Sequence, residues 1–380
     1  MIKFKHKIKI FDTTLRDGEQ MPGVVFKPEE KVELAIKSSE FGCDVIKTMP
    51  SVSDSEASLV KKLSNMGLKA EISAMCMMKK EHIEKTLNCD VQRIMLFTSV
   101  SDLHLEHKLR ISREENLQRA LEALDLAKGH GVKIDFGFED ATRADMNYLI
   151  YFINKLSKDV EYFFPADTLG CLTPSQTYDF IKKLKEECKC LICLHCHNDF
   201  GLATANVLAG LSAGADSFSG TFTGIGERAG NSPIEEVCIA LKYLHGIDLG
   251  VKFDKLKEIC SLVEKYSGVS IQKHKPIVGK NVFVHESGIH VNGVIKHTRT
   301  YENFDPEIVG QKRKFLFGKH SGSSGLRFIL KDFNPSEEEI KKLLKSVKNF
   351  SEHNKKSLSE SDVCELFKTV SGSVSNEKVT

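Results

Sequence analysis

The sequence lacks any apolar run long enough to cross a lipid bilayer, which needs about 20 apolar residues in succession. Its first residues, MIKFKHKIKIFD, alternate basic and apolar side chains and so lack the continuous apolar segment of a secretory signal. It also lacks a charge excess, because the formal net charge is only +2 over 380 residues. These absences argue against membrane insertion, export and nucleic-acid binding, and we expect a cytoplasmic protein.

What is present is typical of a large globular protein. Hydrophobic residues make up 41% of the chain and charged residues 28%. A chain of 380 residues can form one α/β barrel of about 250 residues together with a smaller appendage. The 11 cysteines need no disulfide role, because a chain of this size buries a core without cross-links, and we expect reduced thiols.

Strand-like segments followed by helical patterns recur along the first two-thirds of the chain. The eight predicted strands are residues 7–12, 44–49, 69–74, 92–97, 132–138, 161–166, 190–195 and 216–222. This alternation indicates parallel strands with right-handed crossovers. We predict a (β/α)8 TIM barrel over residues 1–272, with a doubly wound sheet as the alternative, and a small C-terminal lid and helical subdomain over residues 273–380.

Metal-ligand residues follow the predicted strands of this barrel, where the active site of such a fold lies. His195 and His197 are two residues apart on one strand, so both side chains point to the same side and can bind one cation. Asp17 or Asp12 could supply a third ligand from the first strand, and Asn231 could add to the surroundings of the metal. The alternative is a pair of histidines hydrogen-bonded in a polar barrel mouth.

Four long motifs carry a family resemblance, and a fifth short one follows them. They are FDTTLRDGEQ (11–20), HCHNDFGLATAN (195–206), GIGERAGN (224–231) and HESGIHVNGVIKHTRTYE (285–302), followed by GKHSG (318–322). With these motifs the chain resembles the acyl-CoA condensing, or DRE-TIM metallolyase, superfamily, which includes isopropylmalate, citramalate and homocitrate synthases. Together the motifs cover most of residues 7–325.

The resemblance implies a cofactor and the groups that bind the first substrate. A divalent metal, commonly magnesium, manganese or zinc, would be held by Asp17, His195 and His197 and would chelate a 2-oxo acid. Arg16 would polarise the ketone of that acid and stabilise the negative charge that forms on its oxygen, and Thr168 would bind its carboxylate.

The resemblance also implies acetyl-CoA as the second substrate. The groups that would remove a proton from its methyl group are His290 and Tyr301 on the C-terminal segment, with Glu139 facing them. Gln20 and Gly137 would complete the substrate site. In this family the C-terminal segment acts as a lid over the active site of the other subunit, so a homodimer is expected.

The choice of 2-oxo acid rests on finer similarities. The phrases FGLATAN, ALKYLHGID (240–248) and GFEDATRAD (137–145) resemble homocitrate synthases of the nitrogen-fixation type, which implies 2-oxoglutarate as the acceptor and homocitrate and CoA as products. Isopropylmalate or citramalate synthesis is the first alternative. The others are a lyase that runs a retro-aldol cleavage, and a non-catalytic paralogue that binds a metabolite.

Three positions depart from the family pattern. Ile46 stands where family members usually have Glu, and Thr223 stands where many have Asn. Asp135 stands where lysine-pathway homocitrate synthases have an Arg that holds the distal carboxylate of 2-oxoglutarate. All three lie near predicted strand ends, so they bear on the site.

Asp135 would repel a second carboxylate, so a 2-oxoglutarate enzyme needs another partner for it. His104, on the loop after the fourth strand, is the first candidate, and Lys47 or His107 come next. The alternatives are that His104 faces solvent and that Lys47 is an outward-facing lysine at a strand end.

Overall fold

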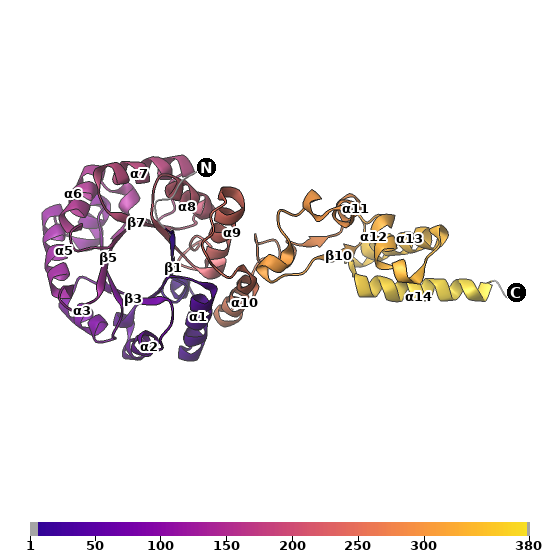
Figure 1. The fold of residues 1–380 in the computed structure, drawn as a ribbon, viewed down its shortest axis with the longest axis horizontal. Helices are drawn as coiled ribbons and strands as arrows, with labels where there is room; N and C mark the ends of the chain where they lie inside the picture. Colours follow the sequence, from indigo (N-terminus) through magenta and orange to yellow (C-terminus); the bar gives the residue numbers. More distant parts are fainter. Residues whose placement is uncertain (1–6, 378–380) are drawn as a thin grey trace. The chain divides into compact units, whose positions relative to one another are not determined.

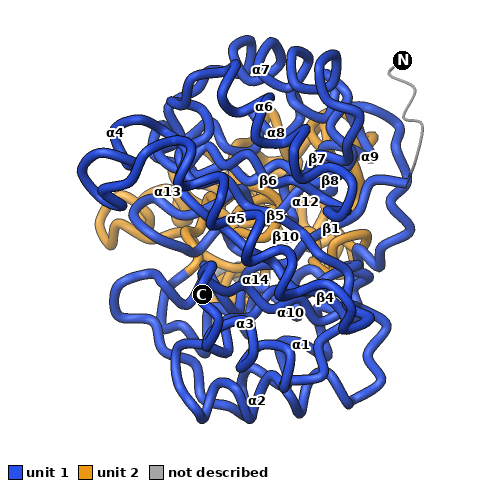
Figure 2. Tube along the Cα trace, turned by 90° about the vertical axis from the view of Figure 1, so that its left-hand side faces the viewer, with its two compact units in different colours: residues 1–270 blue, residues 271–380 orange. Residues whose placement is uncertain are grey.

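The computed structural model describes residues 7–377, which form two compact units (Figure 1). Residues Met1–Ser270 make up the first unit and Ile271–Thr380 the second, as coloured in Figure 2. This division lies two residues before the boundary proposed from the sequence.

Eight parallel strands close into a barrel in the first unit, because β1 pairs with β8 as well as with β2. The strands are β1 (Lys9–Asp12), β2 (Val45–Thr48), β3 (Glu71–Met77), β4 (Arg93–Ser99), β5 (Lys133–Glu139), β6 (Tyr162–Asp167), β7 (Leu191–Cys196) and β8 (Ser217–Gly220). Every predicted strand overlaps one of them. The TIM barrel is therefore confirmed, and the doubly wound sheet is excluded by the closure.

Helices follow the strands and surround the barrel in Figure 1. Local signals set their ends: Pro174 and a Thr173–Gln176 capping box start α7, and Gly42, in the left-handed conformation, ends α1. The barrel helices are α1 (Pro28–Phe41), α2 (Asp54–Ser64), α3 (Lys80–Leu87), α4 (Asp102–His104), α5 (Arg113–Ala127), α6 (Met146–Leu156), α7 (Pro174–Glu187), α8 (Ala203–Ser212), α9 (Ile234–His245) and α10 (Leu256–Ser267).

The second unit is a three-stranded sheet packed against helices. Its elements are β9 (Val284–His285), α11 (Gly288–Lys296), β10 (Lys314–Phe317), α12 (Ser323–Ile329), α13 (Glu337–Asn354), β11 (Leu358–Ser359) and α14 (Glu360–Glu377). Ser336 and Glu339 form a capping box that starts α13.

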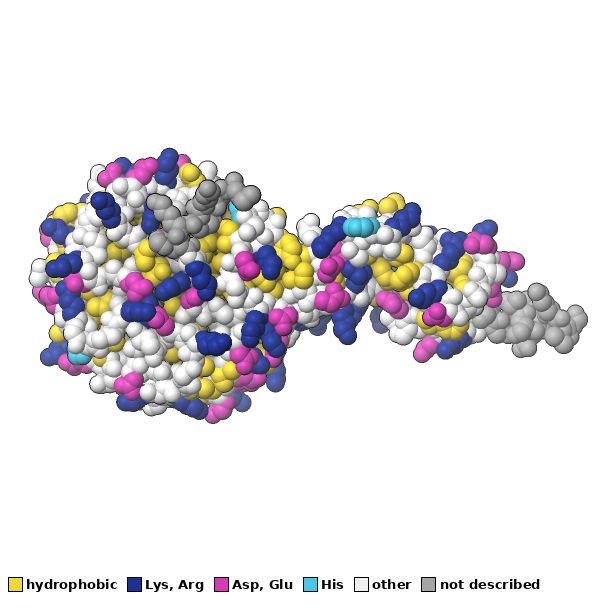
Figure 3. All heavy atoms as spheres, in the orientation of Figure 1, with side chains coloured by type: hydrophobic (Ala, Val, Ile, Leu, Met, Phe, Trp, Pro, Cys, Tyr) yellow, Lys and Arg dark blue, Asp and Glu magenta, His cyan; other side chains and the backbone are white. Residues whose placement is uncertain are grey.

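The surface of the barrel carries both signs of charge. On the face visible in Figure 3, Lys and Arg side chains are interspersed with Asp and Glu side chains. Within residues 7–377, no helix combines the length and the apolar character needed to cross a membrane.

Alternate residues of the strands point into the barrel. The central layer is apolar and contains Phe11, Val45, Met95, Tyr162, Phe164 and Cys193. Towards the N-terminal ends of the strands lies a buried ion pair, in which Arg93 makes two hydrogen bonds of 2.9 and 2.8 Å to Asp135. Glu71 and Glu161 also pair with Arg93, at 2.8 and 3.1 Å.

This ion pair corrects the interpretation of Asp135. The Asp135 carboxylate is fully buried towards the N-terminal ends of the strands, and it accepts a further hydrogen bond from the backbone N–H of Tyr162. Burial alone would lower the pKa of Arg93, but the hydrogen bonds and charge of Asp135 raise it. The negative charge of Asp135 is therefore compensated within the protein and is not free to repel a substrate carboxylate.

We predict that Arg93→Met destabilises the protein by about 3–5 kcal/mol, because it leaves Asp135 buried without its cation. The double variant Arg93→Met/Asp135→Leu should recover most of this loss. Chemical unfolding measures both, with Lys183→Met as the control, since its pair with Glu187 is exposed. A loss below about 1 kcal/mol for Arg93→Met would contradict a structural role for the pair.

Thr223 lies just after β8 with a backbone φ of 65°, in the left-handed region. A β-branched residue is strained there, whereas Asn tolerates this region well. We therefore predict that Thr223→Asn stabilises the protein by about 1 kcal/mol, measured as a higher midpoint of unfolding. Thr223→Val keeps the branched Cβ and should give no gain; an equal gain from both variants would exclude backbone strain as the cause.

Candidate active site

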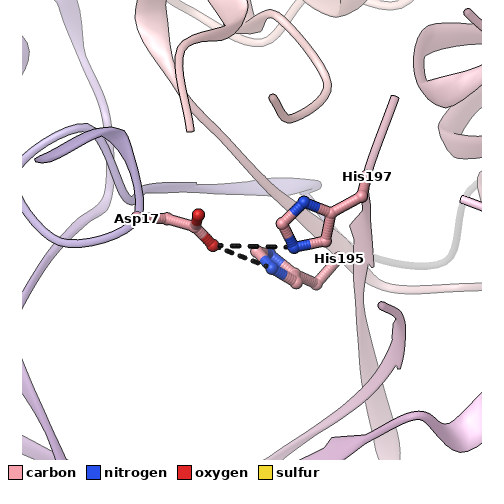
Figure 4. A group of neighbouring side chains, drawn as sticks. All are labelled: Asp17, His195 and His197. Atoms are coloured by element: carbon pink, nitrogen blue, oxygen red, sulfur yellow. Dashed lines mark ion pairs between the residues drawn. The ribbon is translucent and has the colours of Figure 1, made fainter. Parts of the chain in front are cut away.

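Three ligand-type side chains meet at the C-terminal ends of the strands. His195 lies in β7 and His197 directly follows it, while Asp17 belongs to the turn after β1. Asp17 Oδ2 lies 3.2 Å from His195 Nε2 and 3.8 Å from His197 Nε2, as the dashed lines in Figure 4 show. All three residues are buried, and one ligand atom from each lies within 4.8 Å of the others.

The segment 224–231 brings Asn231 to the same place. His197 and Asn231 form a β-bridge, and the N–H of Asn198 donates to Gly230 O at 2.9 Å. Gly226 is essential to this packing: a Cβ there would lie 2.1 Å from Asn231 Nδ2 and 3.1 Å from Asp17 Oδ1. Only glycine permits so close an approach.

The buried atoms of this cluster fit a divalent cation. Asp17 Oδ1 and Asn231 Oδ1 are buried and have no hydrogen-bond partner among the described residues, and His197 turns its Nε2 towards Asp17. A buried acceptor without a partner is costly, and carboxylate, amide and imidazole groups are ligands that divalent metals take. Asp12, the other carboxylate considered, is already used, since it accepts hydrogen bonds from Thr14 and Ser38.

The protonation states are also those that a metal requires. Burial lowers the pKa of His195 to about 4, against the opposite effect of Asp17, and burial likewise lowers the pKa of His197. Burial works to raise the pKa of Asp17, but the charge of Arg16 and the hydrogen bond to His195 hold it well below its usual range. At neutral pH the imidazoles are therefore neutral and the carboxylate is ionised.

A cavity of about 200 Å³ opens beside the cluster. Of the residues predicted from the sequence, its lining includes Arg16, Asp17, Gln20, Gly137, Glu139, Thr168, His195 and His197. Arg16 Nη1 lies 3.2 Å from Asp17 Oδ2 and donates to Gln20 Oε1 at 3.1 Å. The guanidinium group is thus fixed between a carboxylate and an amide.

Glu139 has a partner that the sequence did not reveal. Lys108 Nζ lies 2.6 Å from both carboxylate oxygens of Glu139. Lys108 lies in a single π-helical turn, η3 (Leu105–Leu109), which no sequence pattern predicted. Thr168 Oγ1 accepts the backbone N–H of Asp140 at 2.8 Å, so its own hydroxyl hydrogen remains available to a substrate.

His104 is not among the residues that line the cavity. Its ring lies beside Ser99, with Nδ1 3.5 Å from Glu139 Oε1 and Nε2 3.6 Å from Asp140 Oδ2. Two carboxylates therefore already face the imidazole.

Lys47, ranked behind His104 from the sequence, does line the cavity, and it is only 1% exposed. The interpretation of Lys47 as an outward-facing lysine is wrong. Val45 and Ile46 are both apolar and both buried, so alternation along this strand could not show which face points inward. Ile46 does not line the cavity, so the residue at this position forms no part of its wall.

His290 and Tyr301 belong to the second unit, where their ring centroids lie 4.2 Å apart. Tyr301 is 46% exposed. The neighbouring Glu302 is buried and is held by Arg313, at 2.8 and 2.6 Å, and by His285 at 3.0 Å. An ionic clamp inside the unit thus fixes the segment that presents Tyr301.

The fold and the site together define a class: a (β/α)8 barrel with a buried carboxylate and two imidazoles, suited to a divalent metal, at the C-terminal ends of its strands. Residues 7–263 match the HMGL-like family, and residues 277–355 match the family described as homocitrate synthase post-HMGL domain-like. The chain belongs to the HMGL-like family and so to the DRE-TIM metallolyases that its motifs resemble.

Curated relatives carry three different names. Homocitrate synthase AksA of Methanothermobacter thermautotrophicus is 43% identical, over 93% of this chain and 92% of its own length. In Methanocaldococcus jannaschii, 2-isopropylmalate synthase is 40% identical over 98% of this chain and 73% of its own, and (R)-citramalate synthase CimA is 41% identical over 98% and 76%.

Among solved structures, hydroxymethylglutaryl-CoA lyase from Pseudomonas aeruginosa superposes with a TM-score of 0.64 at 21% identity. The match covers 71% of this chain and 96% of the lyase. At this identity the likeness supports the barrel fold alone.

We predict that His195→Ala and His197→Ala each lose bound divalent metal while the barrel stays folded, because each removes one of three clustered ligands. Calorimetric titration with Mn²⁺ or Zn²⁺ measures the binding, and circular dichroism checks the fold. His107→Ala, whose side chain is 66% exposed, is the matched control. Wild-type metal affinity in both cluster variants would show that the histidines are not ligands.

Proposed function

We propose that the protein is an acyltransferase that condenses acetyl-CoA with a 2-oxo acid, in a metal-assisted Claisen condensation followed by thioester hydrolysis. The observation that carries the proposal is the Asp17–His195–His197 cluster, with its unpartnered acceptors and with Arg16 beside it, in one cavity. The names of the three relatives support the same reaction class.

The cluster and Asn231 would hold a divalent cation, magnesium, manganese or zinc. When bound, such a cation supplies Lewis-acid chemistry that polarises the ketone of the 2-oxo acid. Arg16 points a fixed guanidinium group at the same region and stabilises the negative charge that develops on the ketone oxygen. Gln20 keeps Arg16 in place, and the free hydroxyl hydrogen of Thr168 donates to the carboxylate of the acid.

His290 and Tyr301 take part in removing a proton from the acetyl-CoA methyl group, together with Glu139 on the barrel. The resulting carbon nucleophile attacks the ketone carbon, and water then cleaves the thioester to release CoA. His290 and Tyr301 act on the barrel of a partner subunit, which makes the working form a homodimer. We place the protein in the cytoplasm.

The preferred acceptor is 2-oxoglutarate, which makes the product homocitrate. The similarity to AksA, over 93% of this chain and 92% of AksA, supports this choice. Isopropylmalate or citramalate synthesis is the alternative, because relatives of nearly equal identity carry those names. A non-catalytic metabolite-binding paralogue is the alternative from another class, and the complete set Arg16, Asp17, His195 and His197 in one cavity argues against it.

The release of free CoA thiol from acetyl-CoA tests the proposal. The assay uses 2-oxoglutarate, 2-oxoisovalerate, pyruvate and 2-oxobutyrate as acceptors, with Mg²⁺, Mn²⁺ or Zn²⁺. We expect the highest kcat/KM with 2-oxoglutarate and no activity after chelation. No release with any acceptor would exclude the reaction, and a preference for 2-oxoisovalerate or pyruvate would select the corresponding alternative.

We predict that Arg16→Lys lowers kcat by about 100-fold or more, because a single ammonium group cannot keep both the contact with Gln20 and the charge at the ketone oxygen. Steady-state kinetics with saturating substrates measures the change. Arg119→Lys, at an exposed pair with Glu115, should have wild-type kinetics. An unaltered kcat in Arg16→Lys would make Arg16 a structural residue.

A further inference from the structure

Lys47 is a buried cation without an acidic partner. Its Nζ lies 3.2 Å from Met95 Sδ and 3.5 Å from the centroid of the Phe164 ring. No ion pair within residues 7–377 includes it, although the equally buried Lys31 contacts Glu19 and Glu56. A buried ammonium group normally has an anionic partner, and in the protein alone the Lys47 ammonium group lacks one.

The charged groups around Lys47 do not supply that partner. Asp135 is held by Arg93 at the N-terminal side, and Asp17 is paired with Arg16 at the C-terminal side. The Cys193 thiol stays neutral, because burial raises its pKa to about 12.

Two further acids line the cavity: Glu139 is bound by Lys108, and Glu227 lies 3.6 Å from Arg228 Nη1. Burial lowers the pKa of Lys47 to about 7, which shows how poorly its charge is compensated.

Lys47 shares its cavity with the metal cluster. The wall next to it is formed by sulfur and aromatic side chains, Met49, Met75, Met95, Phe97 and Phe164. Gly137 keeps room for this wall, because a Cβ there would lie 2.6 Å from Met95 Cε. An acceptor with an apolar side chain would cover the ammonium group and leave it unpaired, whereas one with a second carboxylate would pair with it.

We propose that Lys47 binds the distal carboxylate of a dicarboxylic 2-oxo acid and thereby selects that class of acceptor. This inference rests on the proposed condensation. It places acceptor specificity on β2, inside the barrel, and not on His104 in the loop after β4. Asp135 has no part in repelling the acceptor.

Substitution of Lys47 by Met tests the proposal, since Met matches the surrounding wall and removes only the charge. The preference for 2-oxoglutarate over 2-oxobutyrate, as a ratio of kcat/KM values, should fall by about 100-fold or more. Lys47→Gln should give the same direction. Lys80→Met, an exposed lysine, is the matched control.

Proton uptake gives a readout that does not depend on turnover. At pH 8, which is above the pKa of Lys47 in the protein without ligand, the amine is mostly neutral. A distal carboxylate bound beside Lys47 raises this pKa, so the binding of 2-oxoglutarate should be accompanied by the uptake of close to one proton. Calorimetry with Mg²⁺ in buffers of different ionisation enthalpy measures this number. We expect no such uptake with 2-oxobutyrate, and none with 2-oxoglutarate in Lys47→Met.

The outcomes separate this inference from the proposed function. If the wild type releases CoA with 2-oxoglutarate and Lys47→Met keeps the acceptor preference, Lys47 is not the receptor and the condensation stands. If His104→Ala loses more of the preference for 2-oxoglutarate than Lys47→Met does, the distal carboxylate is bound by the loop after β4 and not by Lys47. If the wild type uses no 2-oxo acid at all, the proposed function itself fails.

Discussion

The ionised, buried carboxylate of Asp17 is the constraint on which the site depends. Burial opposes its charge, and Arg16 and the two histidines make the largest contributions that compensate for it. These partners come from opposite ends of the barrel sequence, so the cluster forms only when β1 and β8 pair and close the sheet. The glycine at position 226 then allows Asn231 to approach the carboxylate. The candidate metal site is thus complete only in the closed barrel.

Charge inside the barrel is arranged by depth. At the N-terminal ends of the strands, Arg93 and Asp135 compensate one another, and this layer contributes to stability. At the C-terminal ends, donors and acceptors remain without partners, as a site that binds ligands requires. The Lys47 ammonium group lies between these two regions, beside Phe164 and Met95. Because it has no acidic partner among the described residues, it resembles the unpartnered groups at the C-terminal ends of the strands. The same division explains why an acidic residue at position 135 is compatible with an anionic substrate.

In the second unit, too, a buried ion pair lies beside side chains that remain available to a ligand. Buried Glu302 binds Arg313 and His285, and this clamp fixes the backbone beside Tyr301 while His290 and Tyr301 stay near the surface. Reactive side chains that are exposed but held by a buried ion pair are suited to act on a surface outside their own unit. This arrangement supports the proposed role of the segment as a lid in a homodimer.

The sequence by itself determined the barrel, its eight strands and the histidine pair of the candidate metal cluster, whereas the position of Asp17 and Asp12 along the chain left both open as the third ligand. Strand and helix periodicity is local, and His195 and His197 share a face because they are two residues apart. Tertiary structure alone decided the pairing of Asp135 with Arg93, the contact of Lys108 with Glu139 and the inward direction of Lys47. Arg93 and Asp135 are 42 residues apart, and their contact depends on the register between β4 and β5. Where both neighbours on a strand are buried, as at Val45 and Ile46, only closure of the barrel decides which face meets the cavity.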